Sequence, residues 1–151
     1  MREALFSMVG QHLGGWTVLD AFGGSGLLGL EAWSRGGEVT VYDRDRRAVA
    51  AIRANGAALG AGWKVRRGDV LAAGLEVFDL VLADPPYATD PGVVLQALAP
   101  SARRALVLET ASSANLPASV GTLRLDRRRA YGDTALALYL PLDTRNLEGE
   151  G

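Results

Sequence analysis

The stretch that decides the fold of this chain is TVLDAFGGSGLLG, at residues 17–29. Its first part is apolar and β-branched, as in a buried strand, and a glycine-rich turn then leads into the helical pattern of residues 27–34. Gly24, Gly26 and Gly29 fit the pattern G-x-G-x-x-G in the position that it requires, after a strand and at the start of a helix. Because glycine lets the backbone turn sharply and approach a ligand closely, the stretch predicts a strand–loop–helix unit that binds a cofactor.

The same alternation of strand and helix continues along the chain. Expected strands are 17–21, 39–43, 64–69, 78–84 and 105–109, and expected helices are 2–13, 27–34, 46–59 and 92–98. Each crossover helix must bury its apolar side against the sheet, so this order predicts a parallel sheet covered on both faces. The last expected strands, 122–128 and 134–140, are joined by a short turn at 131–133, which permits only antiparallel pairing. We therefore expect a doubly wound α/β fold whose mostly parallel, seven-stranded sheet ends in an antiparallel hairpin.

The composition is that of one packed, soluble domain. The chain has 151 residues, of which 48% are hydrophobic and 22% charged. We expect a single domain over residues 1–141 and a disordered tail over residues 142–151. No apolar run approaches the roughly 18 residues of a membrane span, and no signal peptide is visible at Met1. The expected protein is therefore a cytoplasmic monomer without membrane contact.

Charge and cysteine content exclude several classes of function. The absence of cysteine rules out disulfides, thiolate metal sites and cysteine nucleophiles, and no other metal site is evident. A net charge of -1 argues against a protein that holds nucleic acid by global positive charge, so any such contact must be local. Residues 127–129 are all arginine and could contact phosphates, although a solvated strand face explains them equally well. His12 fits a helix cap or a surface position.

Three aspartates at the ends of expected strands indicate which cofactor is bound. Asp43 follows Gly24 by 19 residues and can accept hydrogen bonds from ribose hydroxyls, which fits both a nicotinamide dinucleotide and S-adenosylmethionine. Asp20 favours S-adenosylmethionine, because it would interact with the cationic amino-acid end and would repel a pyrophosphate. Asp69 could receive the adenine amino group. The alternative for each acid is an aspartate that only holds its turn or caps a helix. The predicted cofactor-binding residues are Asp20, Phe22, Gly23, Gly24, Ser25, Gly26, Asp43, Arg44, Asp69 and Val70.

The run Asp84-Pro85-Pro86-Tyr87 is the most specific sequence in the chain and follows its most apolar expected strand. The two prolines fix the backbone and hold its carbonyl groups outward as acceptors. Together, the Asp84 carboxylate and the Pro85 carbonyl could bind both N–H groups of an exocyclic base amine and free its lone pair for attack on a methyl group. Tyr87 offers a flat face on which the base could stack. These four residues are the predicted catalytic residues; the alternative is a proline-terminated strand with a packed tyrosine.

Several blocks in the same order resemble the bacterial 16S ribosomal RNA guanine-N2 methyltransferases. They are residues 2–6, 19–32, 84–87 and 131–134, and the resemblance runs from Arg2 to Leu140. It implies a Rossmann-like class I methyltransferase fold, S-adenosylmethionine as cofactor, the N2 amine of a guanine as target, and 16S ribosomal RNA or the small-subunit particle as partner. Gly23 stands where the family commonly has alanine, and Asp43 where it commonly has glutamate. Both replacements keep the chemistry.

The resemblance leaves two points open. Relatives carry an arginine-rich hairpin before the first helix, whereas this chain begins at Met1 almost directly on it, so either the start is misassigned or the arm is missing. Phosphate contacts supply much of the affinity for nucleic acid, so RNA binding depends on this difference.

The alternative functions are a nicotinamide-dependent oxidoreductase, which leaves the proline run unexplained, and a noncatalytic cofactor-binding or RNA-binding module.

Overall fold

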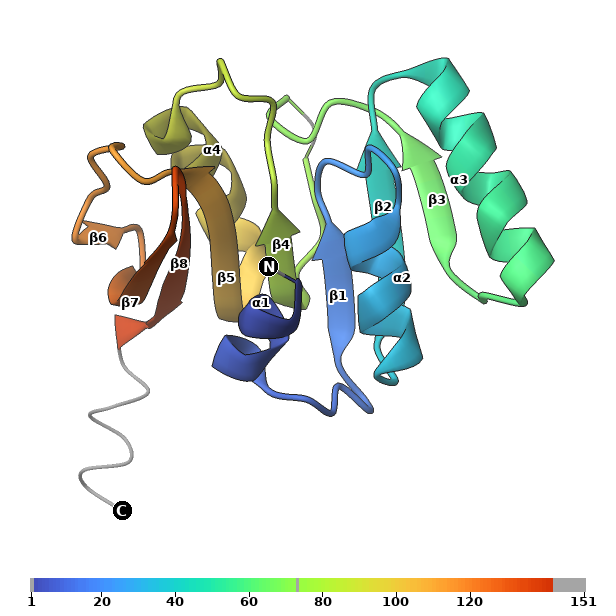
Figure 1. Cartoon of the computed structure of the whole chain (residues 1–151), viewed down its shortest axis with the longest axis horizontal. Coiled ribbons are helices and arrows are strands. Elements are labelled where there is room, and N and C mark those ends of the chain that lie inside the picture. The colour runs from blue at the N-terminus through green and yellow to red at the C-terminus, as the bar shows by residue number, and fades with distance from the viewer. Residues whose placement is uncertain (1, 73, 143–151) are drawn as a thin grey trace.

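The computed structural model describes residues 2–72 and 74–142. Within these residues, eight strands form one sheet in the order β3-β2-β1-β4-β5-β8-β7-β6 (Figure 1). The strands are β1 (Thr17–Asp20), β2 (Glu38–Asp43), β3 (Lys64–Arg67), β4 (Phe78–Ala83), β5 (Ala102–Ala111), β6 (Ser119–Val120), β7 (Leu123–Tyr131) and β8 (Thr134–Pro141). Neighbours from β3 to β5 pair in parallel, and β8, β7 and β6 pair antiparallel. The predicted doubly wound α/β fold with a C-terminal antiparallel hairpin is confirmed.

The predicted count of seven strands is wrong by one. The additional strand is β6, which pairs with β7 through Ser119 opposite Arg124 and Val120 opposite Leu123. A strand of two residues is too short to show the alternation of apolar and polar positions on which sequence-based assignment rests. The sheet therefore has one strand more than predicted at its antiparallel end.

The helices are α1 (Arg2–Val9), α2 (Leu27–Ser34), α3 (Arg46–Leu59) and α4 (Pro91–Leu98), followed by a short 3-10 turn at Ala99–Ser101. The first helix is shorter than the predicted 2–13. It ends because Gly10 takes a positive φ of 120°, which glycine adopts easily. Leu13 is nevertheless fully buried, since the loop carries it back to the core. Leu13 was thus correctly recognised as an apolar position, but its predicted helical conformation is wrong.

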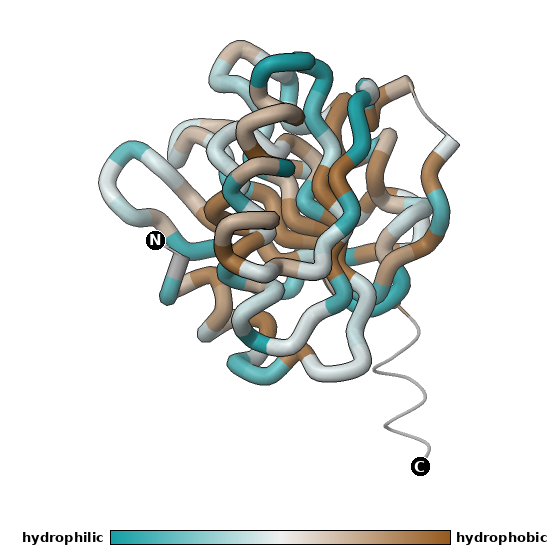
Figure 2. Tube along the Cα trace, turned by 90° about the vertical axis from the view of Figure 1, so that its right-hand side faces the viewer, coloured by the Kyte–Doolittle hydropathy of each residue, from teal (hydrophilic) through white to brown (hydrophobic). Residues whose placement is uncertain are grey.

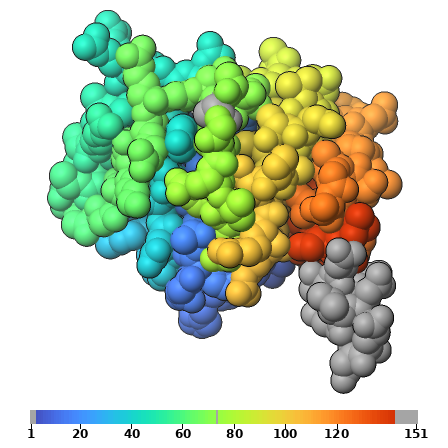
Figure 3. Space-filling model, turned by 180° about the vertical axis from the view of Figure 1, so that it is seen from behind, coloured from blue at the N-terminus to red at the C-terminus, as the bar shows by residue number. Residues whose placement is uncertain are grey.

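The helices cover the two faces of the sheet and create two apolar clusters. One face packs Leu19, Val81 and Leu106 against Leu95 of α4, and the other packs Val18 and Leu80 against α1, α2 and α3. Apolar strands accordingly fill the centre of the molecule, as the brown segments of Figure 2 show. Seen from behind, the region of α4, in yellow, covers the middle of its face (Figure 3). Both faces are buried along the central strands β1 and β4 and the middle of β5, as a parallel sheet requires.

This topology fixes where a ligand can bind. The sheet order reverses between the neighbouring strands β1 and β4, and in open α/β sheets ligands bind at such a point, beyond the carboxyl ends of the strands. That edge lies at the top of Figure 1. Apart from Leu142, the tail predicted for residues 142–151 lies outside the described residues. None of the described helices has the length and apolar character needed to cross a membrane.

Candidate active site

Three cavities meet at Asp84, which directly follows β4 at the carboxyl edge of the sheet. The first, of about 430 Å³, lies among the loops after β1, β2 and β3. The second, of about 150 Å³, lies toward the end of β5 and the start of β8. The third, of about 620 Å³, lies over the glycine-rich loop. We call the first the cofactor cavity and the second the base cavity. A group bound at Asp84 is in reach of both.

Most of the predicted cofactor residues come together around these spaces. The cofactor cavity is lined by Ala21, Phe22, Gly24, Asp43, Arg44, Asp45, Gly68, Asp69, Val70, Asp84, Pro85 and Pro86. Gly23 and Ser25 line the third cavity, beside Phe22 and Gly24. Asp20 and Gly26 line none of the three. Eight of the ten predicted cofactor residues therefore lie on the cavity walls, whereas Asp20 and Gly26 lie behind them.

The glycine-rich loop is shaped by its own hydrogen bonds and by close packing. Gly24 and Gly26 adopt φ values of 56° and 80°, and the Gly26 N–H donates to the Gly23 carbonyl at 2.7 Å. A Cβ atom on Gly29 would lie 2.9 Å from a Val41 methyl carbon. Such a contact does not occur without a shift of the neighbouring residues, so Gly29 allows α2 to approach the sheet. The third glycine of the pattern thus has a packing role.

Asp43 holds the loop in place. Its Oδ2 accepts a hydrogen bond from the Gly24 N–H at 2.8 Å, and its Oδ1 accepts one from the Asp45 N–H at 2.8 Å. Asp43 therefore does the turn-holding work that the sequence gave as the alternative. Each carboxylate oxygen has a second lone pair, so ribose hydroxyls can still donate to it from the cofactor cavity.

Asp20 is a buried acid with an unfilled oxygen. It is only 1% exposed; its Oδ2 accepts a hydrogen bond from the Gly29 N–H at 3.0 Å, while Oδ1 has no hydrogen-bond partner among the described residues. Burial, together with the neighbouring charges of Asp84 and Asp43, raises the pKa of Asp20 to about 7, against the lowering effect of the backbone N–H groups of Gly29 and Phe22. A cationic ligand in the adjoining cavity would offset this repulsion. S-adenosylmethionine, which carries a cationic sulfonium and ammonium, fits such a site.

Asp69 also serves its own turn. Its Oδ1 accepts a hydrogen bond from the Leu71 N–H at 3.0 Å, and the residue is half-buried at the cavity wall beside Val70. The proposed contact with adenine remains a prediction.

No group of three or more histidine, aspartate or glutamate side chains in residues 2–72 and 74–142 could hold a metal ion.

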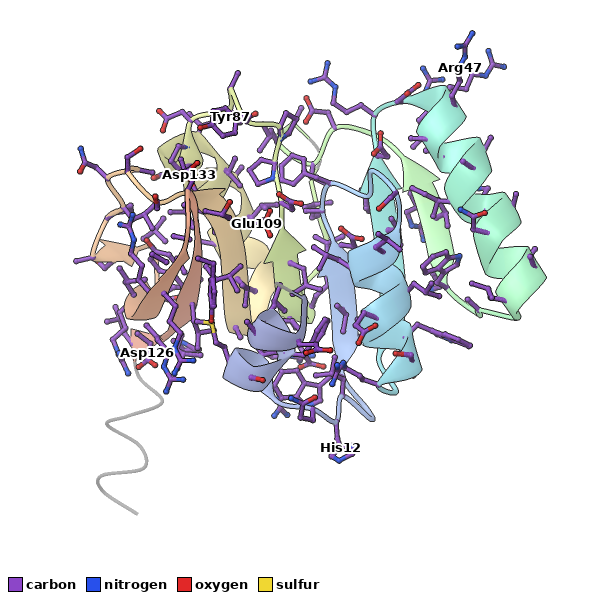
Figure 4. All side chains as sticks on the ribbon, viewed as in Figure 1. His12, Arg47, Tyr87, Glu109, Asp126 and Asp133 are labelled. Atoms are coloured by element: carbon purple, nitrogen blue, oxygen red, sulfur yellow. The ribbon has the colours of Figure 1, made fainter. Side chains whose placement is uncertain are left out.

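The four predicted catalytic residues all line the base cavity. Tyr87 is 91% exposed, so the alternative of a packed tyrosine is wrong. Figure 4 places it in the loop at the upper edge of the molecule, whereas the exposed His12 lies at the opposite edge. The Pro86 carbonyl accepts a hydrogen bond from the Thr89 N–H at 2.9 Å, but no described residue donates to the Pro85 carbonyl. Pro85 thus keeps an acceptor available beside Asp84.

Glu109 is a site residue that the sequence interpretation missed. Ala83 of β4 lies opposite Leu108 of β5, so Asp84 and Glu109 follow side by side, and their carboxyl groups are within hydrogen-bonding reach. Burial, the contact with Asp84 and its charge raise the pKa of Glu109 to about 7. A charged residue at the carboxyl end of an apolar strand was the available signal, and the same signal had identified Asp20 and Asp43. It was overlooked because Glu109 belongs to no recognisable loop motif.

Comparison with known proteins now places the chain in a family. The family model described as "Conserved hypothetical protein 95" matches residues 1–140. The chain belongs to this family. Its membership confirms the resemblance that the sequence blocks carry.

One relative and two solved structures show what the chain is similar to. The chain is 33% identical over 153 aligned positions to "Putative rRNA methyltransferase YlbH" of Bacillus subtilis strain 168, covering 92% of this chain and 83% of that protein. The putative methyltransferase yhhF from Escherichia coli is 28% identical, with a TM-score of 0.79 over 93% of this chain and 83% of its own. Magnesium protoporphyrin IX methyltransferase from Synechocystis PCC 6803, solved with bound SAM, has 16% identity and a TM-score of 0.73 over 93% of this chain and 77% of its own. These likenesses confirm the Rossmann-like class I methyltransferase fold.

Proposed function

We propose that this chain is an S-adenosylmethionine-dependent methyltransferase that modifies the exocyclic N2 amine of a guanine in 16S ribosomal RNA. The observation that carries the proposal is the position of Asp84 and the free Pro85 carbonyl at the junction between the cofactor cavity and the base cavity. The name of the Bacillus subtilis relative supports ribosomal RNA as the substrate. The guanine and the small subunit rest on the family resemblance.

The charges of the cofactor cavity favour S-adenosylmethionine over a nicotinamide dinucleotide. Four aspartates and one arginine are among its lining residues, and a cavity of this charge would repel a pyrophosphate. In dinucleotide-binding folds, free N–H groups of the glycine-rich turn receive the phosphates. Here the Gly24 N–H already donates to Asp43. A carboxylate of the chain itself therefore already accepts from the N–H group that would otherwise receive a phosphate.

The chain's residues can carry out the transfer as follows. The cofactor supplies a methyl group activated by its positive sulfur. Tyr87 stacks on the base, while Asp84 and the Pro85 carbonyl accept hydrogen bonds from the amine and orient its lone pair toward the cofactor cavity. As nitrogen gains positive charge in the transition state, these acceptors bind it more strongly, which lowers the barrier. Asp84 then takes up the proton that the methylated amine loses.

Exposed arginines on the rim of the site support a nucleic-acid substrate. Arg44, Arg46 and Arg47 stand at the start of α3, and Arg66 and Arg67 end the neighbouring strand β3. All five are exposed, and in the described part of the chain none forms an ion pair with an acidic side chain. Figure 4 shows Arg47 at the same upper edge as Tyr87.

The helix itself gains nothing from these cations. The first turn of α3 has no acidic residue, and positive charge there opposes the helix dipole. An RNA phosphate would offset that repulsion. The arginines thus provide the local positive charge that RNA binding requires in a chain with a net charge of -1. Arg128, by contrast, donates to the carbonyls of Ser112 and Ala114 at 2.8 Å each, so its role is to hold a loop.

Two measurements test the proposed function. Calorimetry should detect binding of S-adenosylhomocysteine and no binding of NAD. Transfer of a radiolabelled methyl group from S-adenosylmethionine to small-subunit ribosomal RNA, as transcript and as assembled particle, should then be observed. Binding of NAD in place of S-adenosylhomocysteine would favour the oxidoreductase. Cofactor binding with no transfer to either form of the RNA would favour a noncatalytic module.

A further inference from the structure

The residues that line the base cavity suit a flat, amine-bearing ring. Its lining residues are Asp84, Pro85, Pro86, Tyr87, Thr89, Pro91, Glu109, Thr110, Ala111, Ala114 and Thr134. Prolines, alanines and the exposed ring of Tyr87 provide apolar surface, and the two carboxyl groups stand together at the boundary with the other cavities. A base that enters from solvent past Tyr87 therefore meets Asp84 and Glu109 with its polar edge.

We propose that Glu109 selects the base in this cavity by accepting a hydrogen bond from N1–H of guanine, while Asp84 accepts one from the adjacent N2 amine. This inference rests on the proposed function and names a residue that determines its base specificity. Neighbouring strands lie about 4.8 Å apart, and the register of β4 and β5 sets the two carboxyl groups side by side. The two adjacent carboxylates, which accept hydrogen bonds, match the two adjacent donors of guanine, N1–H and the N2 amine.

The hydrogen-bonding pattern of each base explains why this pair discriminates. Guanine presents N1–H and the N2 amine as neighbouring donors on its Watson–Crick edge, the edge by which enzymes read an extruded base. Adenine and cytosine instead present an amine next to a ring nitrogen that accepts a hydrogen bond. Two ionised carboxylates, which only accept, complement guanine. A pair that shares one proton offers one donor and one acceptor, and so complements adenine or cytosine.

The charges around the pair link this selection to the cofactor. The acids near the pair are Asp84 and Glu109 themselves and Asp20 behind Asp84, and no lining residue of the base cavity is basic. Burial and Asp84 raise the pKa of Glu109 to about 7, so the pair can gain or lose a proton near neutral pH. A cation in the adjoining cavity lowers the pKa of a nearby carboxyl group. A cationic cofactor should therefore ionise the pair and prepare it for guanine.

Binding measurements with base analogues test this role without relying on turnover. The probes are two short oligoribonucleotides of uridines, one with a single guanine and one with a single 2-aminopurine, which keeps the 2-amine but has an acceptor at N1. Sinefungin, which carries a cationic amine in place of the sulfonium, occupies the cofactor site. Wild type should bind the guanine oligomer about tenfold or more tightly than the 2-aminopurine oligomer. In Glu109→Gln, whose amide can donate as well as accept, the ratio should fall toward one.

Controls separate the possible failures. Glu38→Gln changes an exposed glutamate at the start of β2 and should leave the ratio unchanged. If wild type binds no sinefungin, the proposed function fails. If sinefungin and the guanine oligomer bind but Glu109→Gln keeps the wild-type ratio, only the role of Glu109 is overturned.

A measurement on wild type alone covers the case in which Glu109→Gln does not fold. Its affinity for the guanine oligomer should rise as pH increases through about 7, and its affinity for the 2-aminopurine oligomer should fall. Replacing sinefungin with S-adenosylhomocysteine, which has no charge at sulfur, should move the guanine profile to higher pH. Parallel profiles for the two oligomers would overturn the proposal.

Discussion

The two sides of the site differ in how their polar groups are used. On the cofactor side, Asp20, Asp43 and Asp69 each accept a hydrogen bond from a nearby backbone N–H. On the base side, Asp84 and the Pro85 carbonyl accept none from the backbone of the described residues, and Tyr87 is almost fully exposed. The first side is organised before a ligand arrives. The second side leaves these acceptors without backbone donors, so they remain available to a substrate.

The largest effect should come from the base side. Asp84→Ala should lower the rate of methyl transfer by on the order of a hundredfold or more, because an acceptor that acts mainly in the transition state is lost. Affinity for S-adenosylhomocysteine should stay nearly constant. Single-turnover kinetics with calorimetry in parallel would measure both, and Glu38→Ala is a matched control at the opposite edge. Full activity in Asp84→Ala would show that the amine is held elsewhere.

Asp43→Ala should have the reverse pattern. Loss of charge-assisted hydrogen bonds to ribose, together with loosening of Gly24, should weaken S-adenosylhomocysteine binding by about 1 to 3 kcal/mol. The transfer rate at saturating cofactor should change less. Asp43→Glu keeps the carboxylate and should restore most of the affinity. A dissociation constant that is unchanged in Asp43→Ala would remove the residue from the cofactor site.

A smaller effect is expected for the arginine rim. The double substitution Arg46→Ala and Arg47→Ala should raise KM for RNA several-fold and reduce its salt dependence, because fewer counterions are released. The kcat and the cofactor affinity should be preserved. Lys64→Ala removes an exposed cation from the other end of β3 and serves as the control. An equal rise of KM in both proteins would mean that the rim makes no specific contact with the substrate.

The smallest effect should be on stability and should depend on pH. The pKa of Asp20 is raised to about 7 in the folded protein, so the folded state binds more protons than the unfolded chain between about pH 4 and pH 7. The free energy of unfolding should therefore fall as pH rises through this window. Asp20→Asn, which is never charged, should be more stable than wild type at pH 8 and should lose that advantage near pH 4. Denaturant melts at both pH values would measure it, and an advantage that is equal at both would contradict the assigned burial cost.

Local signals explain what the sequence could predict. Helix α3 was predicted with its observed bounds because Asp45 caps its start and Gly60, with a φ of 70°, ends it. The end of α1 was predicted too late because Leu13 continues the helical spacing and is buried without being helical. In both helices the apolar positions identified buried residues correctly. The end of α3 coincides with Gly60, whereas the apolar spacing of α1 continues past Gly10, where that helix ends.

The two sides of the site differ in the same way. The loop acids of the cofactor side lie next to the strands and glycines that identify them. The base cavity is assembled from three segments, around Asp84, Glu109 and Thr134, that are distant in sequence. No local pattern predicts which residues such segments bring together, so Glu109 was missed although its strand was expected.

The most direct test of the proposed function is the chemical identity of the methylated nucleoside. Small-subunit ribosomal RNA would be incubated with wild type and isotopically labelled S-adenosylmethionine, digested to nucleosides and analysed by mass spectrometry, with Asp84→Ala as the negative control. The proposed function predicts that the label appears in N2-methylguanosine and disappears with Asp84→Ala. Label in N6-methyladenosine or N4-methylcytidine, or label in N2-methylguanosine that persists in Asp84→Ala, would contradict it.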